Sequence, residues 1–172
     1  DKFRQPYIAR QVRVTIPVHL APLSWASFQL VEGQVDHRDG IYQNGVIDTP
    51  FVTVSVDEGI TLYDKTTNEA YEDFIQFEDR GDIGNEYIYF QPKGTEPIYA
   101  QLKGYEVLEN NARYAKVLLK HDLTIPVSAD EKLDAEQRGI IEFMKRDAGR
   151  SEELTTIPLE TEMTVFVDNP QI

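Results

Sequence analysis

The sequence contains no cysteine, too few basic residues to balance its acidic ones, and no long apolar run. The absence of cysteine excludes disulfides, thiolate metal sites and cysteine nucleophiles. Its 17 lysines and arginines stand against 30 aspartates and glutamates, a net charge of −13. This balance argues against nucleic acid as a partner, because a phosphate backbone selects basic patches. No apolar run approaches the roughly 20 residues that a membrane-spanning helix needs, so no membrane partner is expected.

A leader sequence is also missing, because no basic segment followed by a short apolar run opens the chain. The sequence begins with Asp1 rather than methionine, and it ends at Ile172 soon after a strand-like segment. Both ends indicate that the 172 residues are a piece cut from a longer protein. The missing leader and the missing cysteines favour a cytoplasmic location for that protein.

The hydrophobic pattern that is present has mostly a period of two, which is typical of half-buried β-strands. In "VRVTIPVHL", residues 12–20, every second residue is apolar, and "ASFQLVE", residues 26–32, gives a second short strand. The Asp39-Gly40 and Asn44-Gly45 pairs are hairpin signals. Further strands are predicted over residues 51–56, 60–64, 70–77, 86–90, 98–109, 113–127 and 153–168.

Residues 128–148 interrupt this rhythm. Ser128 and Glu131 have the spacing of a capping box, and the apolar residues that follow are roughly in helical phase. We therefore expect a short helix or an irregular excursion near 129–146. Turns every 8 to 12 residues elsewhere predict an all-β, mainly antiparallel fold that forms part of a large β-sandwich.

The densest group of acids and aromatics is "FEDRGDIGNEYIYFQP", residues 77–92. An EF-hand calcium loop does not fit, because the positions that would need acids, counted from Asp79, hold Gly81 and Ile83. A phosphate-binding loop does not fit either, since no helix pattern follows the glycines. Two alternatives remain open. A carboxylate pair for glycoside hydrolysis could come from Asp79, Asp82 and Glu86, or the segment is a hairpin turn whose polar side chains bond local backbone groups.

The aromatic residues and histidines are also ambiguous. Tyr87 and Tyr89 fall on one face of the expected strand 86–90, where they could pack at a wet edge or stack on a sugar. Trp25 is predicted to anchor a core. The three histidines are His19, His37 and His121, and their spacing fits no metal motif. We expect them to be ordinary surface or half-buried residues.

Four segments in the same order resemble glycoside hydrolase family 38, the α-mannosidases. "IDTPFVTVSVDEGITLYDKTTNEAYEDF", residues 47–74, looks like the start of that family's large β domain. "FEDRGDIGNEYIYFQP" resembles its bacterial Gly-Asp-x-Gly-Asp-Glu-Tyr stretch, with Asn85 in place of the second Asp. Residues 12–30 are similar to the small β domain that precedes it, and residues 147–172 resemble the segment before its "RF.T..DN" strands. "TTNE" replaces the family's commoner Thr-Gly-x-Glu turn.

The resemblance implies a β portion without the catalytic machinery. In the family, an N-terminal α/β barrel holds zinc through His and Asp side chains, and an Asp nucleophile gives retention of configuration. No catalytic residue and no metal ligand is therefore expected in this chain, and zinc is expected in the parent's catalytic domain. Residues 1–46 would be the small β domain or its remnant. Residues 47–172 would be the N-terminal part of a large, galactose-mutarotase-like β-sandwich, truncated at its C-terminus.

The resemblance also implies partners and site residues. The β region would pack on the catalytic barrel and lend residues to the rim of the active site, where a mannoside binds. Tyr87 would bond a mannose hydroxyl, and Asp82 and Glu86 would line the same pocket. We further expect an exposed apolar patch or an unpaired sheet edge near residues 160–172, through which the piece could self-associate. Two alternatives are a free-standing carbohydrate-binding module that uses Tyr87, Tyr89 and Trp25, and a plain scaffold.

Overall fold

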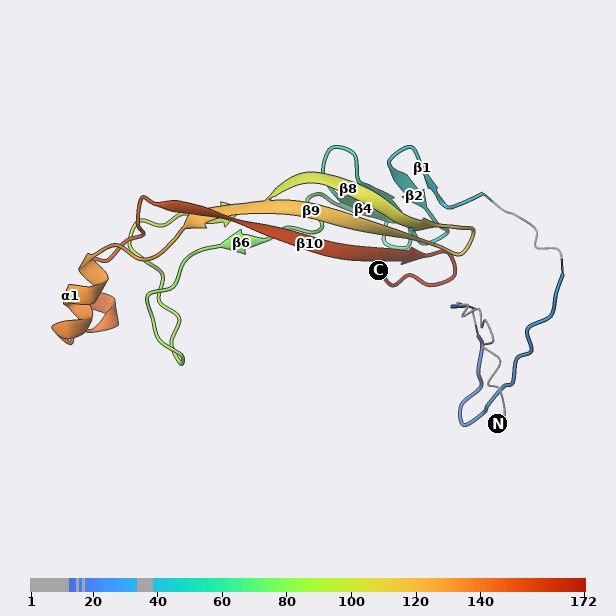
Figure 1. Cartoon of the computed structure of the whole chain (residues 1–172), viewed down its shortest axis with the longest axis horizontal. Coiled ribbons are helices and arrows are strands. Elements are labelled where there is room, and N and C mark those ends of the chain that lie inside the picture. The colour runs from blue at the N-terminus through green and yellow to red at the C-terminus, as the bar shows by residue number, and fades with distance from the viewer. Residues whose placement is uncertain (1–12, 15, 17, 34–38) are drawn as a thin grey trace, which may run out of the picture. The chain divides into compact units, whose positions relative to one another are not determined.

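The computed structural model describes residues 13–14, 16, 18–33 and 39–172 (Figure 1). The chain divides into two units, Asp1–Asp36 and His37–Ile172, each of which is described by itself. The sequence-based boundary between residues 1–46 and residues 47–172 stays a prediction.

The described part of the first unit contains no helix and no strand. The strand predicted over residues 26–32 is therefore wrong. The strand predicted over residues 12–20 falls partly outside the described residues, and those that are described form none. Trp25 is 85% exposed and is not the predicted core anchor. The alternating pattern did not suffice here, because a strand is stable only when a neighbouring strand takes up its backbone hydrogen bonds.

A five-stranded antiparallel meander opens the second unit, with the strands in sequence order. Its strands are β1 (Tyr42–Gln43), β2 (Val46–Asp48), β3 (Val52–Ser55), β4 (Thr61–Asp64) and β5 (Glu69–Tyr71). The predicted hairpin at Asn44-Gly45 is confirmed, with φ of 48° and 80° at its two turn residues. Positive φ at both positions is the type I′ geometry that matches the twist of paired strands. The predicted strands at 51–56 and 60–64 are also confirmed.

The second sheet has three long antiparallel strands in the order β10-β9-β8. They are β8 (Gln101–Asn110), β9 (Tyr114–Pro126) and β10 (Leu154–Phe166), and they confirm three of the predicted strands. Two further short strands, β6 (Glu78–Asp79) and β7 (Ile98–Tyr99), pair with each other. The predicted strand at 86–90 is wrong, because these residues form part of a loop. The predicted strand at 70–77 shrinks to β5.

The core lies between the meander and the three-stranded sheet. Alternate residues of β9 are buried, as the period-two pattern predicts. The buried cluster draws on both sheets and consists of Ile47, Val52, Val54, Val56, Ile60, Leu62, Ala115, Val117, Leu119, Met163 and Val165. The packing confirms an all-β, mainly antiparallel fold with its core between two sheets.

One excursion interrupts the strands, between β9 and β10, as expected. It holds a short helix, α1 (Lys132–Arg138), and a 3₁₀ turn, η1 (Phe143–Lys145). The predicted capping box is wrong, because the N-cap residue Glu131 makes no side-chain cap bond and the Ser128 hydroxyl donates to the Ala129 carbonyl instead. Among the described helices, none is long and apolar enough to cross a membrane.

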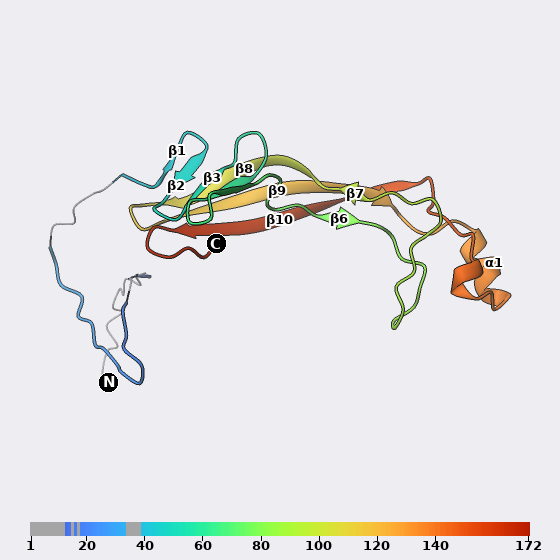
Figure 2. The same cartoon turned by 180° about the vertical axis from the view of Figure 1, so that it is seen from behind.

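The long strand β10 lies at the edge of its sheet and pairs only with β9. The expectation of an unpaired sheet edge near residues 160–172 is therefore confirmed, for the described part of the chain, as far as the end of β10 at Phe166. At the other end of this sheet, the excursion and the loop between β6 and β7 lie side by side in both views (Figures 1 and 2). This end carries the residues that the sequence singled out.

Candidate functional site

The β6–β7 loop, residues 80–97, carries the three predicted site residues Asp82, Glu86 and Tyr87. Its tip is closed by backbone hydrogen bonds rather than by a strand ladder. The Ile83 amide donates to the Phe90 carbonyl at 2.8 Å, and Asn85 and Ile88 exchange bonds at 3.0 and 3.3 Å. Ile83 is only 2% exposed, so the base of this tip is buried.

Two polar side chains give the tip its shape. Asp82 Oδ1 accepts hydrogen bonds from the amides of Gly84 at 2.7 Å and Phe90 at 3.0 Å. Asn85 Oδ1 accepts from the amides of Tyr87 at 2.9 Å and Ile88 at 3.0 Å. Side chains that satisfy nearby amides in this way are the usual device of polar turns. They also explain why residues 86–90 are not a strand, since these amides are already engaged.

Two glycines of the loop, Gly81 and Gly84, are constrained by the surrounding space or by the backbone angle. A Cβ on Gly84 would lie 1.7 Å from the Ile88 carbonyl oxygen, closer than any real contact allows. Gly81 has φ of +68°, and a Cβ there would meet Pro92 and Arg150 at 3.0 and 3.2 Å. The loop is therefore a tightly closed structure whose sequence cannot vary freely at these positions.

Tyr87 projects from this closed tip. Its side chain is 86% exposed, and its hydroxyl has no hydrogen-bond partner among the described residues. Glu86 and Tyr89 are also exposed. The structure thus brings Asp82, Glu86 and Tyr87 into one loop. Asp82 already holds two backbone amides, whereas Tyr87 offers a ring and a hydroxyl to solvent.

The excursion, residues 127–153, contacts the loop through hydrogen bonds and an ion pair. Arg146 Nη1 donates to the Ile83 carbonyl at 2.8 Å, and the Lys93 amide donates to the Ala148 carbonyl at 3.0 Å. Lys93 also forms an ion pair with Asp147, and this hydrogen-bonded pairing raises the pKa of Lys93 and lowers that of Asp147. Sequence reasoning missed these contacts, because no local signal links Arg146 to a carbonyl 63 residues away.

Glu136 of α1 holds the excursion itself together. Its two carboxylate oxygens accept from the amides of Asp147 at 2.6 Å and Ala148 at 3.3 Å. Carboxylates that accept from backbone amides make stronger bonds than neutral acceptors do. The segment that contacts the loop is therefore anchored to the helix.

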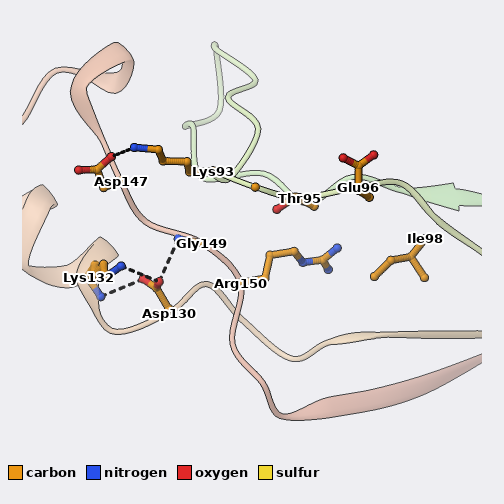
Figure 3. A pocket seen from close by; sticks show the side chains of 10 residues that line it. Lys93, Thr95, Glu96, Ile98, Asp130, Lys132, Asp147, Gly149 and Arg150 are labelled. Carbon is orange, nitrogen blue, oxygen red and sulfur yellow. Dashed lines mark hydrogen bonds and ion pairs between the residues drawn. The ribbon is translucent and has the colours of Figure 1, made fainter.

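A polar pocket of about 640 Å³ separates the base of the loop from the excursion (Figure 3). Lys93, Thr95, Glu96 and Ile98 line one side, and Asp130, Lys132, Asp147, Gly149 and Arg150 line the other. Asp130 Oδ2 accepts from the Gly149 amide at 3.0 Å, and Arg150 forms an ion pair with Asp79. Most of these charges are matched within the pocket or beside it. Among the residues that the structure describes, no group of three or more His, Asp or Glu side chains could hold a metal ion.

The histidines lie apart from this loop. His19 is exposed, as predicted, and His37 lies outside the described residues. The prediction for His121 is wrong: it is 4% exposed in the middle of β9, with its ring 5.4 Å from that of Phe77. Burial lowers the pKa of His121, because the low-dielectric surroundings disfavour the charged imidazolium. The strand pattern could not reveal that the segment carrying Phe77 packs against this position.

Comparisons with known proteins point in one direction. Residues 1–32 match the family model described as "Glycosyl hydrolases family 38 C-terminal domain 1". The chain is 32% identical over 179 aligned positions to a curated protein of Halalkalibacterium halodurans named "Putative mannosylglycerate hydrolase". The alignment covers 96% of this chain and 20% of that protein, so the chain spans about a fifth of the length of this relative.

Two solved structures from Enterococcus faecalis are also similar. One is an α-mannosidase of strain V583, with a TM-score of 0.69 and 32% identity over 75% of this chain and 15% of that chain. The other is described as a protein in the glycosyl hydrolase family 38, with a TM-score of 0.70 and 30% identity over 82% of this chain and 17% of that chain. In each case the similarity covers a small part of a much larger chain.

Proposed function

The chain belongs to glycoside hydrolase family 38, and we propose that it is the non-catalytic β portion of an enzyme that hydrolyses α-mannosidic bonds. Its relatives are large glycoside hydrolases of which this region makes up a fifth or less. In the proposed arrangement, the chain packs on the catalytic domain of the same protein. Its β6–β7 loop then contributes to the rim of the active site.

The observation that carries this proposal is the presentation of Tyr87. A closed tip fixes the backbone at Tyr87 through Asn85, while the ring and hydroxyl stay exposed. A tyrosine held in this way can stack its ring on a sugar face and bond a sugar hydroxyl through its oxygen. Placing such a group in advance lowers the entropy that is lost when substrate binds. The proposed role of Tyr87 is a hydrogen bond to a hydroxyl of the bound mannosyl unit.

The other two loop acids take different roles. Asp82 is occupied by the Gly84 and Phe90 amides, so it shapes the loop that presents Tyr87. Glu86 is exposed beside Tyr87, and its carboxylate could accept a hydrogen bond from a second sugar hydroxyl. The name of the curated relative adds mannosylglycerate to the glycans and small mannosides that are candidate substrates.

Zinc, which the family resemblance implies, would belong to another part of the protein. The described residues offer no cluster of ligands for it, so no step is assigned to zinc in this chain. When bound in a catalytic domain, zinc can orient sugar hydroxyls and help distort the ring. The contribution of this chain is limited to binding and orienting the sugar through the loop.

The test compares the whole protein with the isolated 172-residue chain. The whole protein should hydrolyse an aryl α-mannoside with zinc present, and NMR of the first product should show the retained anomer. The isolated chain should give no turnover under the same conditions. Clear turnover by the isolated chain, or no activity of the whole protein on any α-mannoside offered, would contradict the proposal.

A carbohydrate-binding module is the second candidate, because Tyr87 and Tyr89 are both exposed. A free-standing module should bind mannosides by itself. Calorimetric titration of the isolated chain with methyl α-mannoside separates the two: measurable affinity favours the module, and no heat of binding favours a rim that is completed by another domain.

A further inference from the structure

We propose that Arg146 is a positioning residue that orients the β6–β7 loop and thereby aims Tyr87 at the substrate. The inference rests on the proposed rim function of Tyr87. Arg146 is half-buried in the excursion and lies far from the loop in sequence. Its side chain contacts both the excursion and the β6–β7 loop.

The Arg146 side chain donates hydrogen bonds to two backbone carbonyls. Arg146 Nη1 donates to the Ile83 carbonyl of the loop at 2.8 Å, and Nε donates to the Ile141 carbonyl of the excursion at 3.3 Å. A guanidinium carries several N–H donors in a rigid plane, so one side chain can hold two acceptors at a fixed separation. Arg146 thus links the loop to the excursion through a stiff connector.

The loop needs such a connector because its internal bonds fix its shape and not its direction. Asp82, Asn85 and the Ile83–Phe90 bond all lie within the tip. They would be kept if the tip tilted as a whole. The bond from Arg146 meets the loop at Ile83, which lies four residues before Tyr87 and joins the tip to the body of the chain.

The other end of the connector is itself held in place. Arg146 is followed directly by Asp147 and Ala148, whose amides are bonded to Glu136 of α1. The same two residues contact Lys93 at the far side of the loop through the Asp147 ion pair and the Ala148 carbonyl. The loop is therefore held on both of its limbs, at Ile83 and at Lys93, and Arg146 supplies the contact nearer to Tyr87.

The experiment uses the whole enzyme and an aryl α-mannoside. Arg146→Met removes the donors and keeps much of the side-chain volume. Because Arg146 acts through Tyr87, its loss can cost no more than the contribution of the Tyr87 hydroxyl, so we expect kcat/KM to fall by up to about tenfold. The matched control is Arg138→Met in α1, where an exposed arginine pairs with Asp134 of its own helix and should tolerate the same change within about twofold.

A double-mutant cycle with Tyr87→Phe separates positioning from general support. If Arg146 acts through Tyr87, its loss should change kcat/KM strongly in the wild-type background and little in the Tyr87→Phe background. Both variants should also lose discrimination against the same monodeoxy mannoside, the one that lacks the hydroxyl bound by Tyr87. A merely structural role would lower activity on all the deoxy sugars alike.

The outcomes distinguish this inference from the proposed function. A loss that is equal in both backgrounds, or no loss in either, overturns the positioning role and leaves the rim role of Tyr87 standing. No effect of Tyr87→Phe by itself overturns both. If Arg146→Met does not fold, as judged by thermal unfolding, Arg146→Lys takes its place in the cycle. It keeps one donor for Ile83 and should show the same non-additivity with a smaller loss; additive losses overturn the inference here too.

Discussion

Asp82 offers the sharpest test of how the loop is built. Its Oδ1 accepts from two amides, those of Gly84 at 2.7 Å and Phe90 at 3.0 Å. Asp82→Ala removes both bonds and leaves the two donors to water. A hydrogen bond to a charged group contributes about 1.5–3 kcal/mol, and the exposure of this loop favours the low end. We therefore expect the loop to open more easily by about 2–3 kcal/mol.

Hydrogen exchange measures this opening directly. A loss of about 2–3 kcal/mol corresponds to about a 30- to 150-fold drop in protection of the Gly84 and Phe90 amides. The matched control is Glu86→Ala, which removes the same charge from the same loop but no hydrogen bond to a backbone amide. Asp82→Asn keeps an acceptor and should retain part of the protection. Equal exchange in Asp82→Ala and Glu86→Ala would refute the reasoning.

Two further predictions concern the body of the chain. Arg150→Met should lower the free energy of unfolding in urea by about 3 kcal/mol, because it leaves the Asp79 carboxylate without its partner. The pair is mostly buried, with side chains 12% and 25% exposed. Arg80→Met, which breaks the exposed pair with Glu78, should cost under about 1 kcal/mol, and equal losses would contradict the burial argument. The free energy of unfolding of His121→Leu, relative to that of the wild type, should be higher at pH 5 than at pH 7.5. Burial lowers the pKa of His121 from 6.5, so the unfolded chain binds the extra proton and the wild type loses stability as the pH falls below about 6.5. The same pH dependence of the urea midpoint in wild type and variant would contradict this account.

The sequence predicted the parts of the fold that depend on local signals. Asn44-Gly45 specifies its turn through two residues that accept positive φ, and the alternation along β9 follows directly from the pleat. The same alternation misled at residues 26–32 and 86–90. A period of two states only that a strand is possible, and pairing or competing side-chain bonds decide whether it forms.

The candidate site shows the same division. Tyr87 and Asp82 could be singled out because the short stretch that carries them resembles a segment of family 38. Its acids, glycines and aromatics by themselves left a plain hairpin turn open. The contacts that support the loop could not be predicted, because they join residues that are separated in sequence. Arg146 donates to the Ile83 carbonyl, and Glu136 accepts from the Asp147 amide. Similarly, the burial of His121 depends on segments that are not its neighbours in sequence, such as the one that carries Phe77. The sequence therefore pointed to Tyr87 but not to the contacts that hold its loop in place.

The value of kcat/KM for Tyr87→Phe in the whole enzyme tests the central claim most directly. The substitution removes only the hydroxyl of an exposed ring, so the fold should not change. If that hydroxyl bonds the mannosyl unit, kcat/KM on an aryl α-mannoside should fall by about tenfold, the equivalent of one hydrogen bond, while Tyr89→Phe stays within about twofold. An unchanged kcat/KM for Tyr87→Phe would contradict the account and leave this chain as a scaffold.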